Sequence, residues 1–176
     1  MEKSRLKAKA GKIKLLLLDV DGVLTDGSII YDEQGGELKI FNVRDGAMVK
    51  WLKRAGIEVA ILSGRKSKAL EKRAKELGVE LVIQDAKDKL PAFQTLLKRT
   101  GFNPKEIAYL GDDWHDLVVL KRVGLSACPK DAVEEIKKQV DYVCRAKGGK
   151  GAVRELGELI LKAQGKWQEI IKKYLK

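Results

Sequence analysis

LLLLDVDGVLTDG, residues 15–27, is the stretch of sequence that decides the fold. Its four leucines are apolar on both faces, as a central strand of a helix-covered parallel sheet must be. Asp19 and Asp21 follow at once, and side chains two positions apart point to the same side of an extended chain. The two carboxylates could therefore share one reaction centre, one attacking and the other passing a proton. The alternative interpretation is an acidic turn or a cation-binding loop.

Apolar runs of strand length alternate with amphipathic stretches of helix length along most of the 176 residues. The expected strands are residues 14–18, 58–62, 80–83, 107–110, 125–127 and 142–144. The expected helices cover about residues 46–55, 67–77, 87–100, 113–123 and 131–139. This pattern predicts an α/β fold, a doubly wound, Rossmann-like parallel sheet with helices on both faces. Ligands of such sheets bind beyond the carboxyl ends of the strands, so catalytic residues should directly follow the apolar runs.

Two segments stand outside this alternation. Residues 28–42 predict a β-hairpin insertion that turns at Gly35-Gly36, because glycine tolerates the positive φ of a tight turn. A hairpin alone is marginally stable in water, so we expect it to pack on another surface, such as a second subunit. Residues 157–176 predict an amphipathic helical tail. The whole chain, residues 1–176, is expected to form one domain.

Two more polar clusters follow expected strands. Ser63-Gly64-Arg65 offers a hydroxyl, a backbone amide and a guanidinium, which suit phosphate oxygens. Helix capping by Ser63 or Ser67 explains the serines equally well. The segment Asp85 to Lys89 could bring a lysine that neutralises phosphate charge, with solvated surface charge as the alternative.

A further cluster, Gly111 to Asp116, directly follows the expected strand 107–110. Its carboxylates Asp112, Asp113 and Asp116 suit a hard, oxygen-ligated cation, for which magnesium is the default with phosphate chemistry. The alternative is a capped helix start whose acidic residues lie near the positive end of the helix dipole. We expect His115, the one histidine of the chain, to be a surface or packing residue rather than a ligand.

Composition limits the classes of partner. The 36 basic and 25 acidic residues give a net charge of +11, which could attract nucleic acid or a multiply anionic substrate. Aromatic residues make up 6% and are not interleaved with the basic ones as base stacking requires. No stretch approaches the roughly 20 apolar residues needed to cross a bilayer. We therefore expect a cytoplasmic protein that binds neither nucleic acid nor membrane, with Cys128 and Cys144 as buried free thiols.

The order of the clusters carries more weight than any one of them. Nucleophile candidate, hydroxyl, lysine and acidic pair appear in succession, each after an expected strand, and this order resembles the haloacid dehalogenase superfamily over nearly the whole chain. A closer likeness is to its phosphatases for 3-deoxy-D-manno-octulosonate 8-phosphate (KDO 8-phosphate). That likeness rests on residues 19–27, 41–46, 63–65, 88–90, 111–113 and 148–155. Lys150 stands where arginine is expected, and Trp114-His115 replaces a leucine and a polar residue.

The resemblance implies a phosphatase with a two-step mechanism. Asp19 attacks phosphorus to form an aspartyl-phosphate, and Asp21 protonates the leaving sugar oxygen and then activates water. Ser63 and Lys89 hold the transferred phosphoryl group.

The resemblance also implies the cofactor, Mg²⁺. Its protein ligands would be Asp19, the backbone carbonyl of Asp21, and Asp112. Asp113 and Asp116 would orient these ligands from a second layer.

The expected enzyme is capless, because the chain leaves no room for a cap domain after Asp21 or after Ser63. The resembled phosphatases are tetramers in which hairpins associate and neighbouring subunits help to cover each site, and we expect a homotetramer here. Arg44, Gly64-Arg65 and the loop from Gly148 to Gly151 are the expected contacts to a small phosphorylated sugar acid.

The expected reaction releases KDO and inorganic phosphate from KDO 8-phosphate, a step of lipopolysaccharide precursor synthesis. A nine-carbon, sialic-acid-type sugar 9-phosphate is the nearest alternative substrate, because related domains share the same motifs. A non-catalytic phosphatase-like scaffold is the alternative from another class. The intact set of Asp19, Asp21, Ser63, Lys89 and Asp112 argues against the scaffold.

Overall fold

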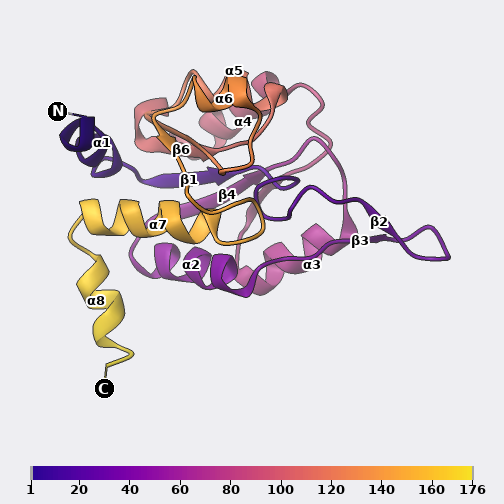
Figure 1. The fold of residues 1–176 in the computed structure, drawn as a ribbon, viewed down its shortest axis with the longest axis horizontal. Helices are drawn as coiled ribbons and strands as arrows, with labels where there is room; N and C mark the ends of the chain where they lie inside the picture. Colours follow the sequence, from indigo (N-terminus) through magenta and orange to yellow (C-terminus); the bar gives the residue numbers. More distant parts are fainter. Residues whose placement is uncertain (1, 176) are drawn as a thin grey trace.

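A six-stranded parallel sheet forms the centre of the computed structural model, which describes residues 2–175 (Figure 1). The strand order is β5-β4-β1-β6-β7-β8. The strands are β1 (Leu15–Leu18), β4 (Glu58–Leu62), β5 (Leu81–Ile83), β6 (Ile107–Leu110), β7 (Leu125–Cys128) and β8 (Tyr142–Val143). Each of the six expected strands is present, and the doubly wound α/β prediction is confirmed. The order reverses at β1, between β4 and β6, which is where ligands bind in such sheets.

Helices cover both faces of this sheet (Figure 1). One layer contains α2 (Val43–Arg54), α3 (Lys68–Leu77) and α7 (Ala152–Ala163), and the other contains α4 (Lys89–Thr100), α5 (Leu117–Leu120) and α6 (Glu134–Lys137). Leu16 and Leu18 of β1 pack into the first layer, whereas Leu15 and Leu17 pack into the second. Alternate side chains of a strand point to opposite faces, so both faces of the leucine run are buried.

The helices differ from expectation in three places. The stretch 113–123 is not one helix but a short 3₁₀ turn, η2 (Trp114–Asp116), followed by α5. The tail 157–176 is divided between α7 and α8 (Trp167–Lys172), because Gly165 adopts φ +71°, a conformation that ends a helix. Helix α1 (Glu2–Ala10), which the sequence did not lead us to expect, packs against α7. A second 3₁₀ turn, η1 (Pro104–Glu106), precedes β6. Among residues 2–175, no helix is long and apolar enough to span a bilayer.

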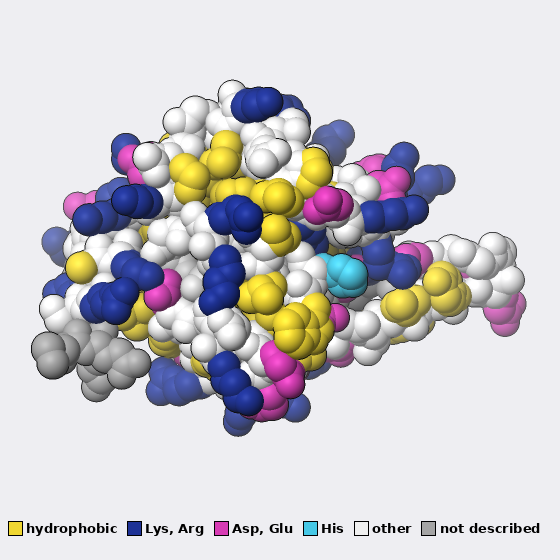
Figure 2. All heavy atoms as spheres, turned by 90° about the horizontal axis from the view of Figure 1, so that it is seen from above, with side chains coloured by type: hydrophobic (Ala, Val, Ile, Leu, Met, Phe, Trp, Pro, Cys, Tyr) yellow, Lys and Arg dark blue, Asp and Glu magenta, His cyan; other side chains and the backbone are white. Residues whose placement is uncertain are grey.

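The expected hairpin projects from the carboxyl ends of the strands as β2 (Ile30–Tyr31) and β3 (Glu37–Leu38) (Figure 1). Gly35 takes φ +78° in its turn, as predicted. Hydrophobic side chains lie uncovered along this arm (Figure 2). Those more than half exposed are Ile29, Tyr31, Leu38 and Ile40. An arm with this much exposed apolar surface fits association with another chain.

Candidate active site

A cavity of about 400 Å³ lies at the carboxyl ends of β1, β4 and β6. It is lined by Asp19, Asp21, Gly64, Arg65, Ala86, Lys87, Lys89, Asp112, Asp113, His115 and Asp116. The four polar clusters therefore meet at one place, although they come from segments far apart in the sequence. Because parallel strands share one carboxyl edge, residues that follow β1, β4 and β6 converge there.

Lys89 lies at the bottom of this cavity, with its side chain 5% exposed. Its ammonium nitrogen is 2.8 Å from a carboxylate oxygen of Asp19 and 2.5 Å from Asp116 Oδ1. It also donates to the hydroxyl of Tyr109 over 3.2 Å. An ammonium group has three N–H donors, and these three contacts provide one partner for each of them.

Asp116 ties this lysine to the loop after β6. Its Oδ1 accepts hydrogen bonds from Lys89 and from the Tyr109 hydroxyl, both over 2.5 Å. Its Oδ2 accepts from the backbone amides of Asp112 (2.8 Å) and Asp113 (3.2 Å). Both oxygens are thus engaged by the protein, and Asp116 acts as a brace between α5, Lys89 and the acidic loop.

Tyr109 was not anticipated as a site residue, because it lies inside the apolar strand β6 and is fully buried. Burial and the nearby charge of Asp116 raise the pKa of its hydroxyl well above the ordinary value, so the group stays protonated and donates. Its position in a buried strand carried no sequence signal of a polar role.

Asp19 and Asp112 provide oxygens that a cation could use. Together with Asp116, they place carboxylate oxygens within 4.8 Å of one another. Asp112 Oδ1 is buried and has no hydrogen-bond partner among residues 2–175. A buried oxygen left without a donor is costly unless a ligand satisfies it, and carboxylate oxygens are what Mg²⁺ prefers.

Gly22 allows the carboxylate of Asp112 to approach the loop after β1. Its φ is +84°, and a Cβ atom at this position would lie 2.1 Å from Asp112 Oδ2. Any side chain at this position would therefore displace the carboxylate of Asp112. The glycine that follows Asp21 is required here by geometry.

Close packing of these carboxylates changes their acidity. Burial and the charge of Asp116 raise the pKa of Asp19 to about 7. Burial, together with the charges of Asp19 and Asp116, raises the pKa of Asp112 to about 8. Burial by itself would lower the pKa of Lys89, but the two carboxylates Asp19 and Asp116 raise it, so the lysine is charged. The centre carries more negative charge than one lysine offsets, and a bound cation would relieve it.

Asp21 faces the cavity from the loop after β1, beside the base of the hairpin. Its Oδ1 lies 2.5 Å from the ammonium of Lys39, and its Oδ2 lies 3.8 Å from Nε of Arg65. Lys39 follows directly on β3, and its side chain is 2% exposed. The sequence analysis did not identify Lys39, because nothing in a hairpin sequence shows which body residue its base will meet.

Ser63 is buried at the end of β4, where its hydroxyl accepts a hydrogen bond from the backbone amide of Arg65 over 3.2 Å. Of the two serines considered as caps, Ser67 is the one that begins α3, accepting from the amide of Leu70. Arg44 is exposed in the first turn of α2 and does not line the cavity in the described chain.

The loop from Gly148 to Gly151 supports the site from below rather than opening onto it. Backbone amides of this loop donate to the carboxylates of Asp131 and Asp45 and to the carbonyl of Val23. A Cβ atom on Gly148 would lie 1.8 Å from the carbonyl oxygen of Gly22, so this loop packs directly against the loop that follows β1. These amides have protein partners, which argues against a direct ligand contact through them.

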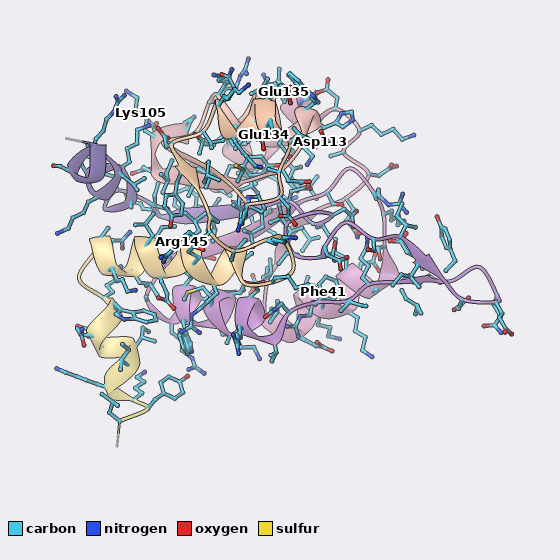
Figure 3. The ribbon with its side chains drawn as sticks, viewed as in Figure 1. Phe41, Lys105, Asp113, Glu134, Glu135 and Arg145 are labelled. Atoms are coloured by element: carbon cyan, nitrogen blue, oxygen red, sulfur yellow. The ribbon has the colours of Figure 1, made fainter. Side chains whose placement is uncertain are left out.

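The acidic loop after β6 runs beside the start of α6, because the amide of Val133 donates to the carbonyl of Asp112 over 3.1 Å. Figure 3 labels Asp113 in this region and Phe41 below it, where the chain leaves the hairpin for α2. Asp113 is exposed and caps η2 through the amide of Trp114. Its carboxylate thus shapes the loop that carries Asp112.

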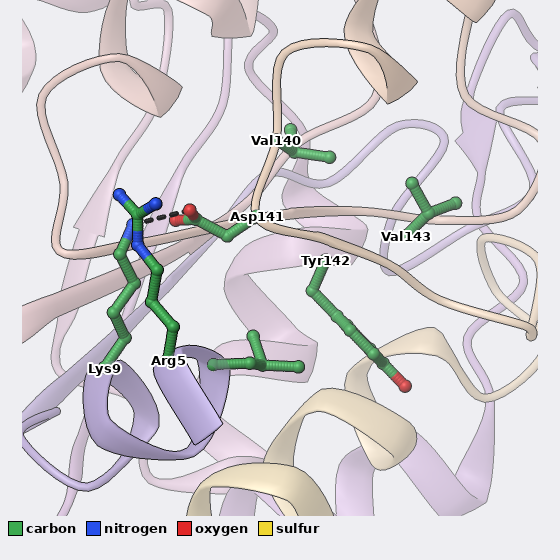
Figure 4. A pocket seen from close by; sticks show the side chains of 7 residues that line it. Arg5, Lys9, Val140, Asp141, Tyr142 and Val143 are labelled. Atoms are coloured by element: carbon green, nitrogen blue, oxygen red, sulfur yellow. Dashed lines mark hydrogen bonds and ion pairs between the residues drawn. The ribbon is translucent and has the colours of Figure 1, made fainter. Parts of the chain in front are cut away.

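A second cavity, of about 370 Å³, lies between α1 and β8 (Figure 4). Arg5 and Lys9 line it from α1, and Lys9 forms an ion pair with Asp141 over 2.5 Å. It contains none of the residues that the sequence singled out. The chemistry of the chain is therefore concentrated in the first cavity.

Comparison with known proteins gives a consistent result. Residues 30–124 match the haloacid dehalogenase-like hydrolase family. Over 92% of this chain and 86% of the relative, the sequence is 48% identical to 3-deoxy-D-manno-octulosonate 8-phosphate phosphatase KdsC of Escherichia coli K12.

Solved structures agree with this comparison. The crystal structure of 3-deoxy-D-manno-octulosonate 8-phosphate phosphatase from Yersinia pestis is 46% identical, with a TM-score of 0.92 over 93% of this chain and 89% of that one. The phosphatase of the same name from Moraxella catarrhalis, solved with magnesium, phosphate and KDO, is 42% identical, with a TM-score of 0.95 over 97% of this chain and 98% of that one.

Proposed function

We propose, from the premise that this chain belongs to the haloacid dehalogenase-like hydrolases and is a phosphatase, that it hydrolyses KDO 8-phosphate to KDO and inorganic phosphate. The observation that carries the proposal is the cavity that brings Asp19, Lys89 and Asp112 together in a chain 48% identical to KdsC. The relative crystallised with KDO, phosphate and magnesium has the same fold along almost its whole length. We assign the reaction to lipopolysaccharide precursor synthesis in the cytoplasm.

Magnesium is the cofactor of this site. Asp19, the backbone carbonyl of Asp21 and Asp112 would hold it, and the partnerless Asp112 Oδ1 supports this assignment. Once bound, Mg²⁺ neutralises charge on the phosphate oxygens. Asp116 is fully engaged by protein donors, which supports a bracing role for it, with Asp113 shaping the loop beside it.

Asp19 is the nucleophile in this proposal. One of its oxygens bonds to phosphorus as the bond from phosphorus to the sugar oxygen breaks, and a proton on Asp21 moves to that sugar oxygen. Asp21 then takes a proton from the water that attacks the aspartyl-phosphate, which frees Asp19 and phosphate. Asp21 lies two positions beyond Asp19 and lines the same cavity, as this exchange of roles requires.

Lys89 and Ser63 hold the transferred phosphoryl group. Lys89 already contacts Asp19 at 2.8 Å, so its charge lies where charge on the phosphoryl oxygens develops. Ser63 ends β4 beside Gly64, whose backbone lines the cavity. A hydroxyl and an amide at a strand end are suitable donors to phosphoryl oxygens.

Arg65 and Arg44 are the proposed cationic contacts to the sugar acid. Arg65 lines the cavity with 41% of its side chain exposed, which leaves its guanidinium accessible to a carboxylate. Arg44 lies outside the cavity of a single chain. It can contact a substrate only if the bound sugar extends beyond the cavity or a neighbouring subunit brings it there.

A homotetramer accounts for the exposed hairpin and the open site. Four side chains of the hairpin are more than half exposed, and their burial between subunits would remove apolar surface from water. The cavity has no covering domain of its own in the described chain, so a neighbouring subunit would restrict access to it.

Phosphate release with magnesium from a panel of sugar phosphates tests the substrate assignment. Strong selectivity for KDO 8-phosphate supports the proposal. A preference for a nine-carbon sugar 9-phosphate would replace the substrate but keep the chemistry. If no phosphate is released from any phosphomonoester, a non-catalytic phosphatase-like scaffold is favoured instead.

A further inference from the structure

Four charged side chains meet where the hairpin joins the body, and we call Asp21, Glu37, Lys39 and Arg65 the hairpin-base quartet. Lys39 Nζ lies 2.5 Å from Asp21 Oδ1 and 2.6 Å from Glu37 Oε1. Arg65 Nη2 lies 2.7 Å from Glu37 Oε2, and its Nε lies 3.8 Å from Asp21 Oδ2. Two acidic side chains face two basic ones, and Glu37 contacts both Lys39 and Arg65.

The members of the quartet do not lie equally close to the cavity. Asp21 and Arg65 line it, whereas Glu37 and Lys39 do not. The side chain of Lys39 is 2% exposed, which leaves no surface on which a substrate could touch it. Lys39 therefore lies behind Asp21 and can act on the reaction only through that residue.

From this arrangement we propose that Lys39 is a positioning residue for proton transfer. It holds Asp21 Oδ1 from behind, so that Oδ2 is the oxygen directed to the leaving group, while Glu37 keeps Lys39 and Arg65 in place. The inference rests on the proposed function of Asp21 as the acid that protonates the sugar oxygen. It makes the hairpin, through the two residues that it contributes, part of the catalytic apparatus as well as a candidate contact between subunits.

The physical reason is the geometry that proton transfer requires. A general acid must lie within hydrogen-bond reach of the atom it protonates, and a displacement of about 1 Å can cost roughly 100-fold in rate. A carboxylate on an otherwise free side chain samples several rotamers. A charge-assisted hydrogen bond to one oxygen, from a lysine that is itself held by Glu37, restricts that sampling.

Two substrates, KDO 8-phosphate and p-nitrophenyl phosphate, distinguish a positioning role of Lys39 from a purely structural one. A sugar oxygen needs a proton as it leaves, whereas p-nitrophenolate leaves without one. Because kcat/KM reports the steps up to formation of the aspartyl-phosphate, loss of the acid lowers kcat/KM for KDO 8-phosphate much more than for p-nitrophenyl phosphate. Damage to the fold would affect both substrates alike, and light scattering identifies loss of subunit association separately.

The experiment compares Lys39→Met, which keeps the length of the side chain but not its charge, with Lys39→Arg and with Lys66→Met as an exposed control. For Lys39→Met we expect kcat/KM for KDO 8-phosphate to fall about 10- to 100-fold and that for p-nitrophenyl phosphate to change by less than about threefold. Lys39→Arg should recover part of the loss, and Lys66→Met should match the wild type. Thermal melting and light scattering identify any variant that no longer folds or associates.

Asp21→Asn, measured beside them, separates the two levels of the proposal. If Asp21→Asn shows the leaving-group difference and Lys39→Met does not, the role of Lys39 is wrong while the proposed function stands. If Asp21→Asn lowers kcat/KM equally for both substrates, or if the wild type releases no phosphate, the assignment of Asp21 as the acid is wrong. The inference about Lys39 then fails with it. A parallel loss on both substrates in Lys39→Met also overturns the inference, since it marks a structural role.

Discussion

The carboxylates of Asp19 and Asp112 determine how the site responds to pH. Their pKa values, about 7 and about 8, lie above the ordinary range because both groups are buried beside other carboxylates. A metal ligand must be deprotonated, so Mg²⁺ competes with protons below these values. We therefore expect the affinity for Mg²⁺ to be highest above pH 8 and to fall as the pH drops through 8 and then 7.

We predict that Mg²⁺ binding releases protons at pH 6.5 and releases almost none at pH 9. Isothermal titration calorimetry in two buffers of different ionisation enthalpy measures the number released. In the acidic range the affinity should fall by up to about tenfold per pH unit for each protonated ligand. An affinity that stays constant between pH 6 and 9 would contradict the assignment of these two ligands.

Substitution of Gly22 tests the close approach between the loop after β1 and the loop after β6, which carries Asp112. In Gly22→Ala the Cβ atom, placed ideally, would lie 2.1 Å from Asp112 Oδ2, so the Asp112 side chain must move. We expect at least a tenfold loss of Mg²⁺ affinity and of kcat/KM, in addition to about 1 kcal/mol of backbone strain at positive φ.

Gly35→Ala is the matched control for that change. Gly35 has a similar φ, +78°, but nothing lies within 4 Å of its ideal Cβ position. It should lose a comparable amount of stability in urea denaturation without losing metal affinity. Equal effects of both substitutions on metal binding would show that strain, rather than contact with Asp112, is responsible.

The residues that the sequence indicated are those that directly follow apolar strands. Asp19 after β1 and Asp112 after β6 were identifiable because parallel strands bring their carboxyl ends to one edge. Tyr109 and Lys39 were not, for different physical reasons. Tyr109 has the burial and strand position of a core residue, and the contact of Lys39 depends on how the hairpin folds back onto the body.

At the scale of elements, the strands were more predictable than the helices. Buried parallel strands are short and uniformly apolar, so their bounds are visible in the sequence. The tail was expected as one helix because its apolar residues keep a helical period, and the break depends on the single conformation of Gly165. Stretch 113–123 begins as a 3₁₀ turn because Asp116 turns back to cap the loop that carries Asp112.

The hairpin is the element whose role can be tested by a single surface change. Ile40 is 64% exposed on the arm, and a lysine there would place a charge in the proposed contact between subunits. Ile40→Lys should convert the proposed tetramer into smaller species in light scattering and raise the KM for the sugar acid. Each chain should remain folded, because Ile40 lies on the surface of the arm and is not part of the buried core.

Val143→Lys provides the comparison for this element. Val143 is 39% exposed on β8, at the far edge of the sheet from the hairpin, where lysine is well tolerated. It should leave the oligomeric state unchanged. A wild-type protein that is a monomer at working concentration, or a tetramer that survives Ile40→Lys, would contradict association through the hairpin.

At the scale of the whole molecule, the fold separates support from chemistry. The leucines of β1 are buried at the centre of the sheet, and the loop from Gly148 to Gly151 packs against the loop that follows β1. The reactive groups occupy one open cavity at the edge where the strand order reverses. The net charge of +11 favours the approach of an anionic substrate.

If Asp19 is the nucleophile, it carries the phosphoryl group of the sugar acid phosphate during turnover, and following that group tests its role. Wild-type protein is mixed with KDO 8-phosphate and magnesium, quenched in acid, digested and analysed by mass spectrometry, beside Asp19→Asn and the exposed control Glu135→Gln. We expect a phosphorylated peptide containing Asp19 in the wild type and in Glu135→Gln. In folded Asp19→Asn we expect neither this peptide nor phosphate release. Phosphate release by Asp19→Asn at a rate near that of the wild type, or a phosphoryl group on another residue, would contradict this role of Asp19.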